Sequence, residues 1–448
     1  MVRGDEHQRG GKATPQGSDG NGMPAALKSR LARMLRHPLQ LIGPGWITGV
    51  ADDDPSGIAT YSQAGAQFGF DMLWTMPLSY PLMAAVQSLC ARLGRVTGQG
   101  LALNIKRTYP PWVLYGAVGL LLIANTLNIG ADVAAMGDVA ALMVGGYRHV
   151  LTVILGAASL LLQVFIPYHR YVKYLKWLTL SLLSYIAVLF TVRVPWGQVA
   201  LHTLRPELTL NVPTATVILG VFGTTISPYL FFWQCSEEVE DLRARGARAL
   251  GREAAAVGLA EVRRIRWDTW SGMLYSNVVA YFIILAAAVT LHTAGIHDIQ
   301  TAAQAAAALK PLAGNFAFYL FGLGILGVGA IGVPVLAGSA GYALAEARGW
   351  ASGLERGARD ARGFYGVIAA SMLLGVVLGF TPISPIRALF YSAVLNGIVA
   401  VPLIVIVLLL TSRASVMGRY TADWLSLALG WLTAVLMAGA SVGMFMTG

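Results

Sequence analysis

The chain has few charged residues and few cysteines. Asp, Glu, Lys and Arg make up 12% of its 448 residues, about half the share found in typical soluble domains. Its two cysteines, Cys90 and Cys235, are too few for a disulfide framework or a thiolate metal site, so we expect both to pack in the interior. We also find no nucleophile paired with a base and no nucleotide-binding loop. These shortages exclude an ordinary soluble fold, and the sequence predicts neither an enzyme nor a bound cofactor.

Hydrophobic residues, in contrast, make up 56% of the chain and gather in about eleven apolar stretches. Most have about 20 residues or more, enough for a helix to cross a hydrocarbon core of about 30 Å. The stretches lie at about residues 39–65, 72–91, 112–144, 150–166, 171–192, 214–236, 270–291, 315–345, 364–380, 387–411 and 421–446. The sequence therefore predicts an all-α polytopic membrane protein with about eleven transmembrane helices in a lipid bilayer.

The basic residues predict the orientation of these helices. If the amino terminus is cytoplasmic, most of the 32 Lys and Arg residues fall in cytoplasmic segments, as the positive-inside rule requires. The exceptions are Arg148, Arg193, Arg205, Lys310 and Arg387. We therefore expect an integral protein of the bacterial inner membrane, with a cytoplasmic amino terminus and an outside carboxyl terminus.

The net charge of +10 is explained by anchoring against anionic lipid and predicts no nucleic-acid partner. No obligate protein partner is evident either. Residues 1–38 are basic and Gly-rich without an apolar core, so we expect a disordered cytoplasmic tail.

Two of the apolar stretches are interrupted in the middle. The first interruption is residues 52–57, Asp-Asp-Asp-Pro-Ser-Gly, and the second is residues 223–228, Gly-Thr-Thr-Ile-Ser-Pro. Polar, Pro-containing backbone at membrane depth survives only where it lines a cavity or coordinates a solute. The three aspartates make a cation the expected solute.

Each interruption also has a plainer explanation. Residues 52–57 could form an exposed turn in which Asp54 only caps a helix, but the roughly 13 residues before it would span only about 20 Å as a helix. Residues 223–228 could form a proline kink in one continuous helix.

The two interruptions occupy matching places in two halves of the chain. Residues 39–193 hold stretches one to five, and residues 214–411 hold stretches six to ten. Because five spans per half invert the second half in the membrane, we predict two inverted repeats. Residues 421–446 would be an extra span outside the repeat.

The motifs resemble those of the NRAMP divalent-metal transporters. Residues 43–46, Gly-Pro-Gly-Trp, followed by 54–57, Asp-Pro-Ser-Gly, are similar to the first span of that family, whose motif is Asp-Pro-Gly-Asn. Residues 223–229 are similar to its sixth span, which ends in Met-Pro-His, and residues 128–134, with Asp132, resemble its third span. The resemblance implies a leucine-transporter-like 5+5 inverted repeat with unwound first and sixth helices. It also implies alternating-access transport of a divalent metal.

Two metal ligands of the family are absent from the matching positions. Gly57 stands where the family has Asn, and Ser227 stands where it has Met. A thioether favours transition metals, whereas oxygen ligands suit magnesium and manganese. Magnesium retains several waters when it binds, so a site without the Asn and Met side chains would suit it. The sequence therefore resembles the NRAMP-related magnesium transporters. The expected activity is uptake of partly hydrated magnesium, and also of manganese.

The predicted metal site combines both interruptions. Asp54 is expected to bind the ion directly and Asp53 through water or charge, while Asp52 belongs to the helix end. Asn277 and Asn396 could line the same cavity or bond to a neighbouring helix. The predicted site residues are Asp53, Asp54, Gly57, Thr224, Thr225, Ser227, Asn277 and Asn396.

Proton coupling is not expected from the residues present. Tyr229 stands at the family's His position and Ala135 at that of a third-span Glu, so only Asp132 remains. A phenol titrates near pH 10 and does not shuttle protons at neutral pH. A proton-coupled manganese or iron transporter and a cation-coupled small-molecule carrier of the same fold stay open as alternatives.

An acidic group follows the sixth apolar stretch. Glu237, Glu238 and Glu240 could form a solvated helix surface or a vestibule for the metal, and the surface is the favoured interpretation.

Overall fold

The computed structural model describes residues 43–166, 178–206, 211–246, 249–250, 255–354 and 356–446, and these residues contain helices and turns but no strand. The predicted tail at 1–38 and the start of the fifth stretch, 171–177, lie outside them. The longer helices are α3 (Pro55–Phe68), α4 (Thr75–Thr97), α6 (Pro111–Val144), α7 (Arg148–Phe165), α11 (Val212–Thr225), α12 (Pro228–Ala244), α13 (Ala255–Ala287), α16 (Ala317–Arg348), α17 (Arg362–Leu378), α18 (Pro385–Ser412) and α20 (Trp424–Met446). The shorter helices are α2 (Pro44–Asp52), α5 (Leu101–Thr108), α9 (Leu183–Val188), α10 (Trp196–Leu204), α14 (Ala302–Ala306), α15 (Lys310–Ala313) and α19 (Ala414–Met417). Single helical turns are η2 (Gly69–Met72), η3 (Leu178–Leu182), η5 (Ala288–His292), η6 (Ala307–Leu309), η7 (Gly314–Phe316) and η8 (Gly418–Tyr420).

Within the described ranges, seven helical segments are long and apolar enough to cross a membrane. They are Pro111–Val144, Arg148–Phe165, Val212–Ala244, Gly258–His292, Ala302–Arg348, Pro385–Ser412 and Trp424–Met446. The polytopic all-α prediction is therefore confirmed, while the count of eleven and the division into repeats stay predictions. One reason for the smaller number is that the first stretch is divided, so neither half reaches the required length.

The first stretch breaks where the sequence predicts it. α2 ends at Asp52, and α3 begins at Pro55 with Asp54 as its N-cap in an extended conformation (φ −83°, ψ 173°). Proline disfavours helical geometry in the residue before it and has no N–H to donate. The Asp54 carboxylate instead accepts from the backbone N–H of Gly57. Asp52, Asp53 and Asp54 are all at most 2% exposed, so this break is a buried element and not an exposed turn.

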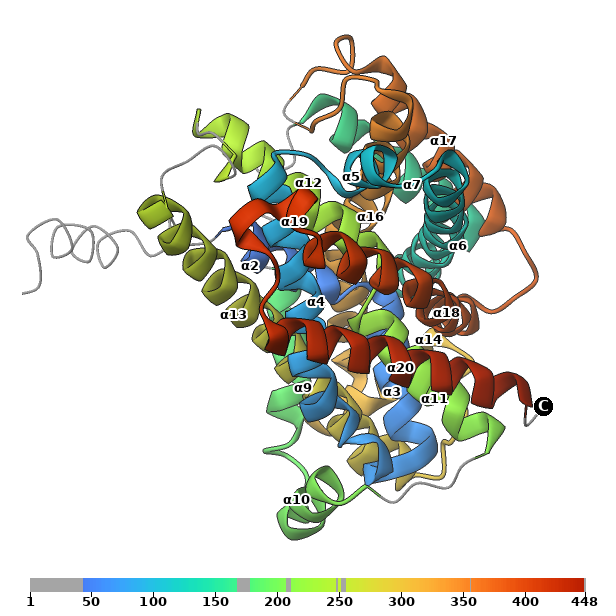
Figure 1. Cartoon of the computed structure of the whole chain (residues 1–448). Helices are drawn as coiled ribbons and strands as arrows, with labels where there is room; N and C mark the ends of the chain where they lie inside the picture. The colour runs from blue at the N-terminus through green and yellow to red at the C-terminus, as the bar shows by residue number, and fades with distance from the viewer. Residues whose placement is uncertain are drawn as a thin grey trace, which may run out of the picture. The chain divides into compact units, whose positions relative to one another are not determined.

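The second stretch breaks in the same manner. α11 ends at Thr225, Ser227 is extended (φ −73°, ψ 134°), and Pro228 opens α12. In Figure 1, α2 and α3 are drawn in blue, and α11 and α12 in light green. Each break thus leaves the last carbonyls of one half-helix and the first amides of the next without helical partners.

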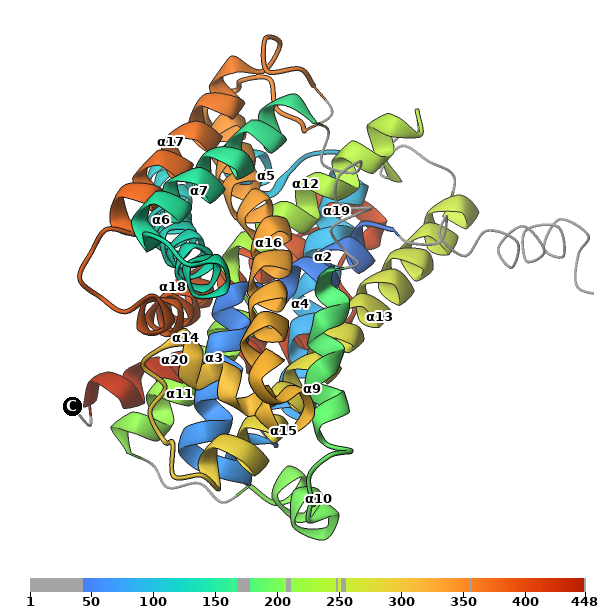
Figure 2. The ribbon, with the colours of Figure 1, turned by 180° about the vertical axis from the view of Figure 1, so that it is seen from behind.

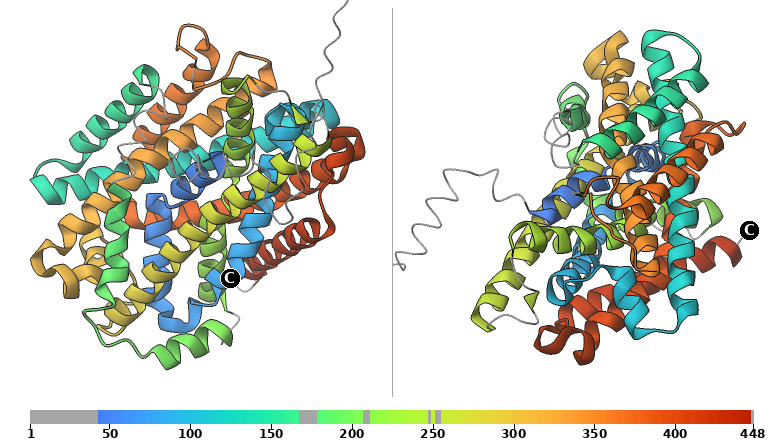
Figure 3. Two further views of the ribbon diagram at one scale, coloured as in Figure 1. Left: turned by 90° about the vertical axis from the view of Figure 1, so that its left-hand side faces the viewer. Right: turned by 90° about the horizontal axis from the view of Figure 1, so that it is seen from above.

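The helices around the breaks pack as two neighbouring groups. α6, α7, α16 and α17 pack against one another, as Figure 2 shows on its left side and centre. α13 lies along α2, α3 and α4, and both views of Figure 3 show it beside the blue half-helices. α18 bridges the groups, because it contacts α3, α6, α11 and α20.

Glycines allow the half-helices to approach their neighbours closely. A Cβ on Gly49 of α2 would meet the backbone of Gly272 of α13, and a Cβ on Gly223 of α11 would meet the backbone of Ala393 and Gly397 of α18. Small residues permit such close backbone contact between membrane helices. The two cysteines are buried and free, as predicted.

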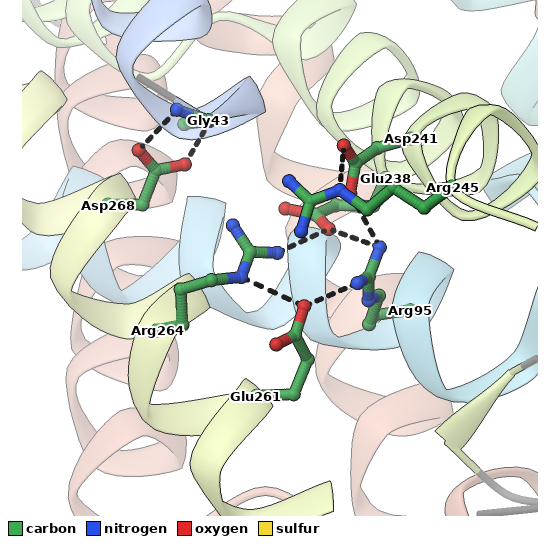
Figure 4. A network of polar contacts seen from close by, with 9 residues as sticks. Gly43, Arg95, Glu238, Asp241, Arg245, Glu261, Arg264 and Asp268 are labelled. Atoms are coloured by element: carbon green, nitrogen blue, oxygen red, sulfur yellow. Dashed lines mark hydrogen bonds and ion pairs between the residues drawn. The ribbon is translucent and has the colours of Figure 1, made fainter. Parts of the chain in front are cut away.

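An ion network holds the predicted cytoplasmic ends of both half-helices (Figure 4). Asp268 of α13 accepts from the backbone N–H groups of Gly43 and Gly45 at 3.0 and 2.8 Å, and so caps α2. One turn earlier on α13, Arg264 contacts Glu238 of α12 at 3.5 Å. The negative charge of Asp268 at the amino terminus of α2 also interacts favourably with the helix dipole.

Arg95 of α4 completes the network. Its guanidinium pairs with Asp241 at 2.7 Å, with Glu238 at 3.7 Å and with Glu261 of α13. The side chain of Glu238 is 0% exposed, so the prediction of a solvated surface is wrong for this residue. The sequence shows the acids but not the arginines that α4 and α13 bring to them. Glu240 accepts from the hydroxyl of Tyr342 and the N–H of Leu354 instead.

Removing Arg95 is expected to destabilise the protein strongly. Arg95→Met leaves the buried Glu238 carboxylate with one cationic partner fewer, and breaking a buried pair from one side costs about 3–5 kcal/mol. The thermal unfolding midpoint of the purified protein measures this loss. Adding Glu238→Gln to Arg95→Met should recover part of it, and Arg245→Ala, which breaks an exposed pair with Asp241, should change the midpoint little. A midpoint unchanged by Arg95→Met would contradict the assigned role of the network.

Candidate metal site

Asp54 lies at the centre of the site and contacts three helices. Its Oδ1 accepts from the Ser56 hydroxyl at 2.6 Å and from the Gly57 N–H at 2.9 Å. Its Oδ2 accepts from the Asn128 amide of α6 at 3.1 Å and from the Tyr229 hydroxyl of α12 at 3.3 Å. Both oxygens are therefore fully hydrogen-bonded without an ion, and an ion that binds here replaces some of these donors.

Asp52 and Asp53 meet a different helix. The Ser276 hydroxyl of α13 lies 2.6 Å from Asp52 Oδ2 and 3.0 Å from Asp53 Oδ1. The other oxygen of each carboxylate, Asp52 Oδ1 and Asp53 Oδ2, is buried and has no hydrogen-bond partner among the described residues. Asp52 and Asp53 thus accept fewer hydrogen bonds than Asp54 does.

The three carboxylates do not form a ready-made cage. Among the described residues, no three His, Cys, Asp or Glu side chains are grouped as metal ligands. The contacts explain this, because Asp52 and Asp53 face α13 whereas Asp54 faces α6 and α12. An ion at Asp54 would therefore have few carboxylate ligands and would need other oxygens or water.

Gly57 lies where the first break, Tyr61 and the second break meet closely. A Cβ at this position would lie 3.2 Å from the Tyr61 ring, 3.3 Å from Thr224 Oγ1 and 3.8 Å from Asp54 Oδ1. A side chain at position 57 would thus point at Asp54 and at the second break. This is the position where the resembling family has Asn.

Of the three hydroxyls predicted to line the site from the second break, only that of Thr224 faces Gly57, as described above. The Thr225 hydroxyl donates back to Val221 O at 3.0 Å, and the Ser227 hydroxyl donates back to Thr224 O at 2.7 Å. Their hydrogens are engaged, so only oxygen lone pairs are left for a cation. Tyr229 reaches the site itself, since its hydroxyl contacts both Asp54 and the Ala51 carbonyl, the latter at 3.4 Å.

α6 adds one more acid to the site. Asp132 follows Asn128 by four residues and therefore lies on the same face of α6. It is fully buried, neither of its oxygens has a hydrogen-bond partner among the described residues, and it lies within electrostatic range of Asp54.

Of the two predicted asparagines, Asn277 bonds to a neighbouring helix, and the placement of Asn396 at the site stays a prediction. The Asn277 amide donates to Ser79 Oγ of α4 at 2.9 Å and also contacts Met83; its neighbour Ser276 is the residue that meets the aspartates. This is the outcome that the sequence left open as a bond to a neighbouring helix. Asn396 is 1% exposed with an amide that has no partner in the described part of the chain. It precedes Gly397, which packs on Leu219 of α11.

The site holds excess negative charge. No Lys or Arg of the described residues forms an ion pair with Asp52, Asp53, Asp54 or Asp132. Buried carboxylates are costly unless they are paired or bind a metal. A cation bound here would offset this charge.

A cavity of about 370 Å³ lies between α3, α11 and α18, toward the ends opposite the ion network. Its lining includes Ala59 and Gln63 of α3, Thr216 of α11 and Phe390 of α18. Ala59 lies little more than one helical turn beyond Asp54. The cavity thus lies on the predicted outer side of the first break, and its lining includes none of the residues of either break.

Comparison with known proteins identifies the family. The family model described as natural resistance-associated macrophage protein-like, or Nramp, matches residues 45–447. The chain belongs to the Nramp family. Nramp proteins are membrane transporters and not enzymes, and they have substrate metal ions and no resident cofactor.

Individual Nramp relatives match most of the chain. It is 29% identical over 453 residues to the divalent metal cation transporter MntH of Acidiphilium cryptum (strain JF-5), covering 93% of this chain and 91% of the relative. The structure of the Eremococcus coleocola manganese transporter aligns with a TM-score of 0.73 at 18% identity, covering 97% and 89%. Mhp1, a nucleobase-cation-symport-1 family transporter, aligns with a TM-score of 0.59 at 11% identity, covering 91% of each chain. The resemblance is thereby confirmed at the level of the Nramp family and fold.

Sequence reasoning missed three residues of the site. Asn128, Ser276 and Tyr229 contact the aspartates, yet none was predicted to do so. Asn128 carried a usable signal, because it lies one turn before Asp132 in an apolar helix, where polar residues are functional by default.

Proposed function

We propose that this protein takes up divalent metal ions by alternating access, with partly hydrated magnesium as its main substrate and manganese as a second. The observation that carries the proposal is the cluster of four buried carboxylates, Asp52, Asp53, Asp54 and Asp132, without a cationic partner among the described residues. A solute with positive charge satisfies this cluster. An anionic or zwitterionic solute would place its carboxylate against it, which argues against a small-molecule carrier.

The oxygen ligands available support magnesium. Asp54 is the carboxylate that a side chain at position 57 would meet. Thr224, Ser227 and the backbone carbonyls freed by the second break add neutral oxygens. Magnesium is usually bound by one or two carboxylates and keeps several waters. Gly57 adds no side-chain ligand, so water would complete the shell of the ion, and the Ser227 hydroxyl is a harder ligand than the family's thioether.

The two ends of the site support alternating access. The cavity between α3, α11 and α18 lies on the predicted outer side of Asp54, whereas the network of Arg95, Arg264 and Glu238 closes the predicted inside. In this mechanism an ion enters through the cavity, binds at Asp54, and leaves after α2 and α12 separate at their cytoplasmic ends.

The driving force in this proposal is the ion gradient together with the membrane potential. Moving a divalent ion through 100 mV is worth about 4.6 kcal/mol. Tyr229 lies 3.3 Å from Asp54 Oδ2, in the place where the resembling motif has His, and gives no neutral-pH proton carrier. A proton-coupled manganese or iron transporter is the second candidate, because Asp132 is retained beside the site.

Uptake into proteoliposomes tests the substrate. The wild-type protein is expected to take up magnesium and manganese, and Asp54→Ala should lose at least about 90% of the rate because the central ligand is gone. Asp360→Ala removes an exposed aspartate and should behave as wild type. Manganese uptake without any competition from magnesium would refute the magnesium assignment.

Restoring the two family ligands should change the selectivity. In Gly57→Asn with Ser227→Met, the new side chains add an amide and a soft thioether beside Asp54, so magnesium uptake should fall about tenfold or more while manganese uptake persists. Competition between the two ions in the uptake assay gives the ratio. Gly119→Asn, at a position where an added Cβ meets nothing within 4 Å, is the matched control and should leave the ratio unchanged.

Proton movement is measured separately. With a pH-sensitive dye inside the proteoliposomes, magnesium uptake driven by an inside-negative potential is expected without internal acidification. Acidification that tracks magnesium uptake and disappears in Asp54→Ala would favour the proton-coupled alternative.

A further inference from the structure

We propose that Asn128 supplies the amide-oxygen ligand that the first break lacks. This inference rests on the proposed function of the same site. Asn128 belongs to α6, which is not part of either break. Its side-chain amide contacts the carboxylate of Asp54. The lost ligand at Gly57 would then be replaced from the opposite side of the carboxylate.

The geometry of the amide suggests a role beyond a hydrogen bond. Nδ2 donates to Asp54 Oδ2 at 3.1 Å, while Oδ1 is buried and has no partner among the described residues. Asn128 itself is 0% exposed. A buried carbonyl oxygen without a donor is costly, and a cation beside Asp54 would satisfy it.

Rotation of the amide brings its oxygen to a ligand position. A half-turn about the Cβ–Cγ bond exchanges Oδ1 and Nδ2 and places the oxygen about 3 Å from Asp54 Oδ2. Adjacent oxygens in an octahedron with magnesium distances of about 2.0–2.1 Å are also about 3 Å apart. Without an ion the nitrogen faces the carboxylate, because two oxygens would repel; with an ion between them the oxygen is favoured.

Neighbouring contacts hold α6 in the orientation that this role needs. Three residues earlier, the Asn125 amide donates to Leu336 O at 2.8 Å and to Ser339 Oγ at 2.7 Å, both on α16. These bonds fix the rotation of α6, so Asn128 keeps facing Asp54. Asn125 is therefore a positioning residue for Asn128, and its own amide hydrogens are engaged by α16.

The alternative is that Asn128 only positions Asp54 by donating a hydrogen bond. The two roles differ in what a carboxylate at position 128 would do. Asn128→Asp keeps an oxygen ligand of the same size but removes the N–H donor. A ligand role therefore tolerates this change once an ion is bound, whereas a donor role does not.

The test is manganese binding to the purified full-length protein, followed by electron paramagnetic resonance with magnesium as competitor. Asn128→Leu should weaken binding of both ions by about tenfold or more, the loss typical of a disturbed metal shell. Asn128→Asp should bind within about threefold of wild type or more tightly. Asn104→Leu removes another buried amide, which donates to Gln99 O and Gly100 O, each at 2.9 Å. This variant should keep wild-type affinity although its thermal midpoint falls, which separates ligand loss from damaged folding.

Each outcome decides the inference. Wild-type affinity in Asn128→Leu overturns it, and equal weakening in Asn128→Leu and Asn128→Asp overturns it in favour of a positioning donor. Failure of the proposed function is seen in the wild type, which would then bind neither ion, and it removes this inference as well. If Asn128→Leu does not fold, the affinity of Asn128→Asp relative to that of Asn128→Ser decides between the two roles, since only the carboxylate keeps an oxygen at ligand distance.

Discussion

The cost of burying carboxylates in a membrane protein is the constraint on which the rest of this structure depends. Asp54 tolerates burial because four donors surround it and because it caps the positive end of α3. Asp52, Asp53 and Asp132 have fewer or no donors. The break in the helix is what reduces this cost, since it frees backbone amides for the acid and leaves the carbonyls at the ends of α2 and α11 for a cation.

In the proposed function, selectivity depends on the side chains around Asp54. A bulky amide at position 57 or a thioether at position 227 would bring a second and third protein ligand to the ion and exclude water. Gly57 and Ser227 supply neither of these ligands, whereas Asn128 and Tyr229 contact Asp54 from α6 and α12. Because the carboxylates face different helices, an ion at Asp54 would have this residue as its one carboxylate ligand. Such a ligand set suits an ion that keeps part of its hydration shell.

The sequence predicted the breaks because proline and charge at membrane depth have few structural explanations. It did not predict which side chains face the aspartates. Ser276 and Asn277 differ by one position, which is about 100° around α13, and only packing against α2 and α4 decides that Ser276 meets the acids. Glu238 was misassigned for the same reason, since its partners Arg95 and Arg264 come from helices distant in sequence. The helix count stays untested because the first stretch is divided and part of the fifth lies outside the described residues.

The two half-helices that form the candidate site are also the ones held at the predicted cytoplasmic end. α2 carries Asp52 at one end and is capped by Asp268 near the other; α12 begins at the site and carries Glu238 in the ion network. A motion that separates α2 from α12 there must also disturb the contact of Tyr229 with Ala51 and Asp54. In the proposed cycle, opening toward the cytoplasm and weakening of the metal site are therefore one structural event, and no separate signal between them is required.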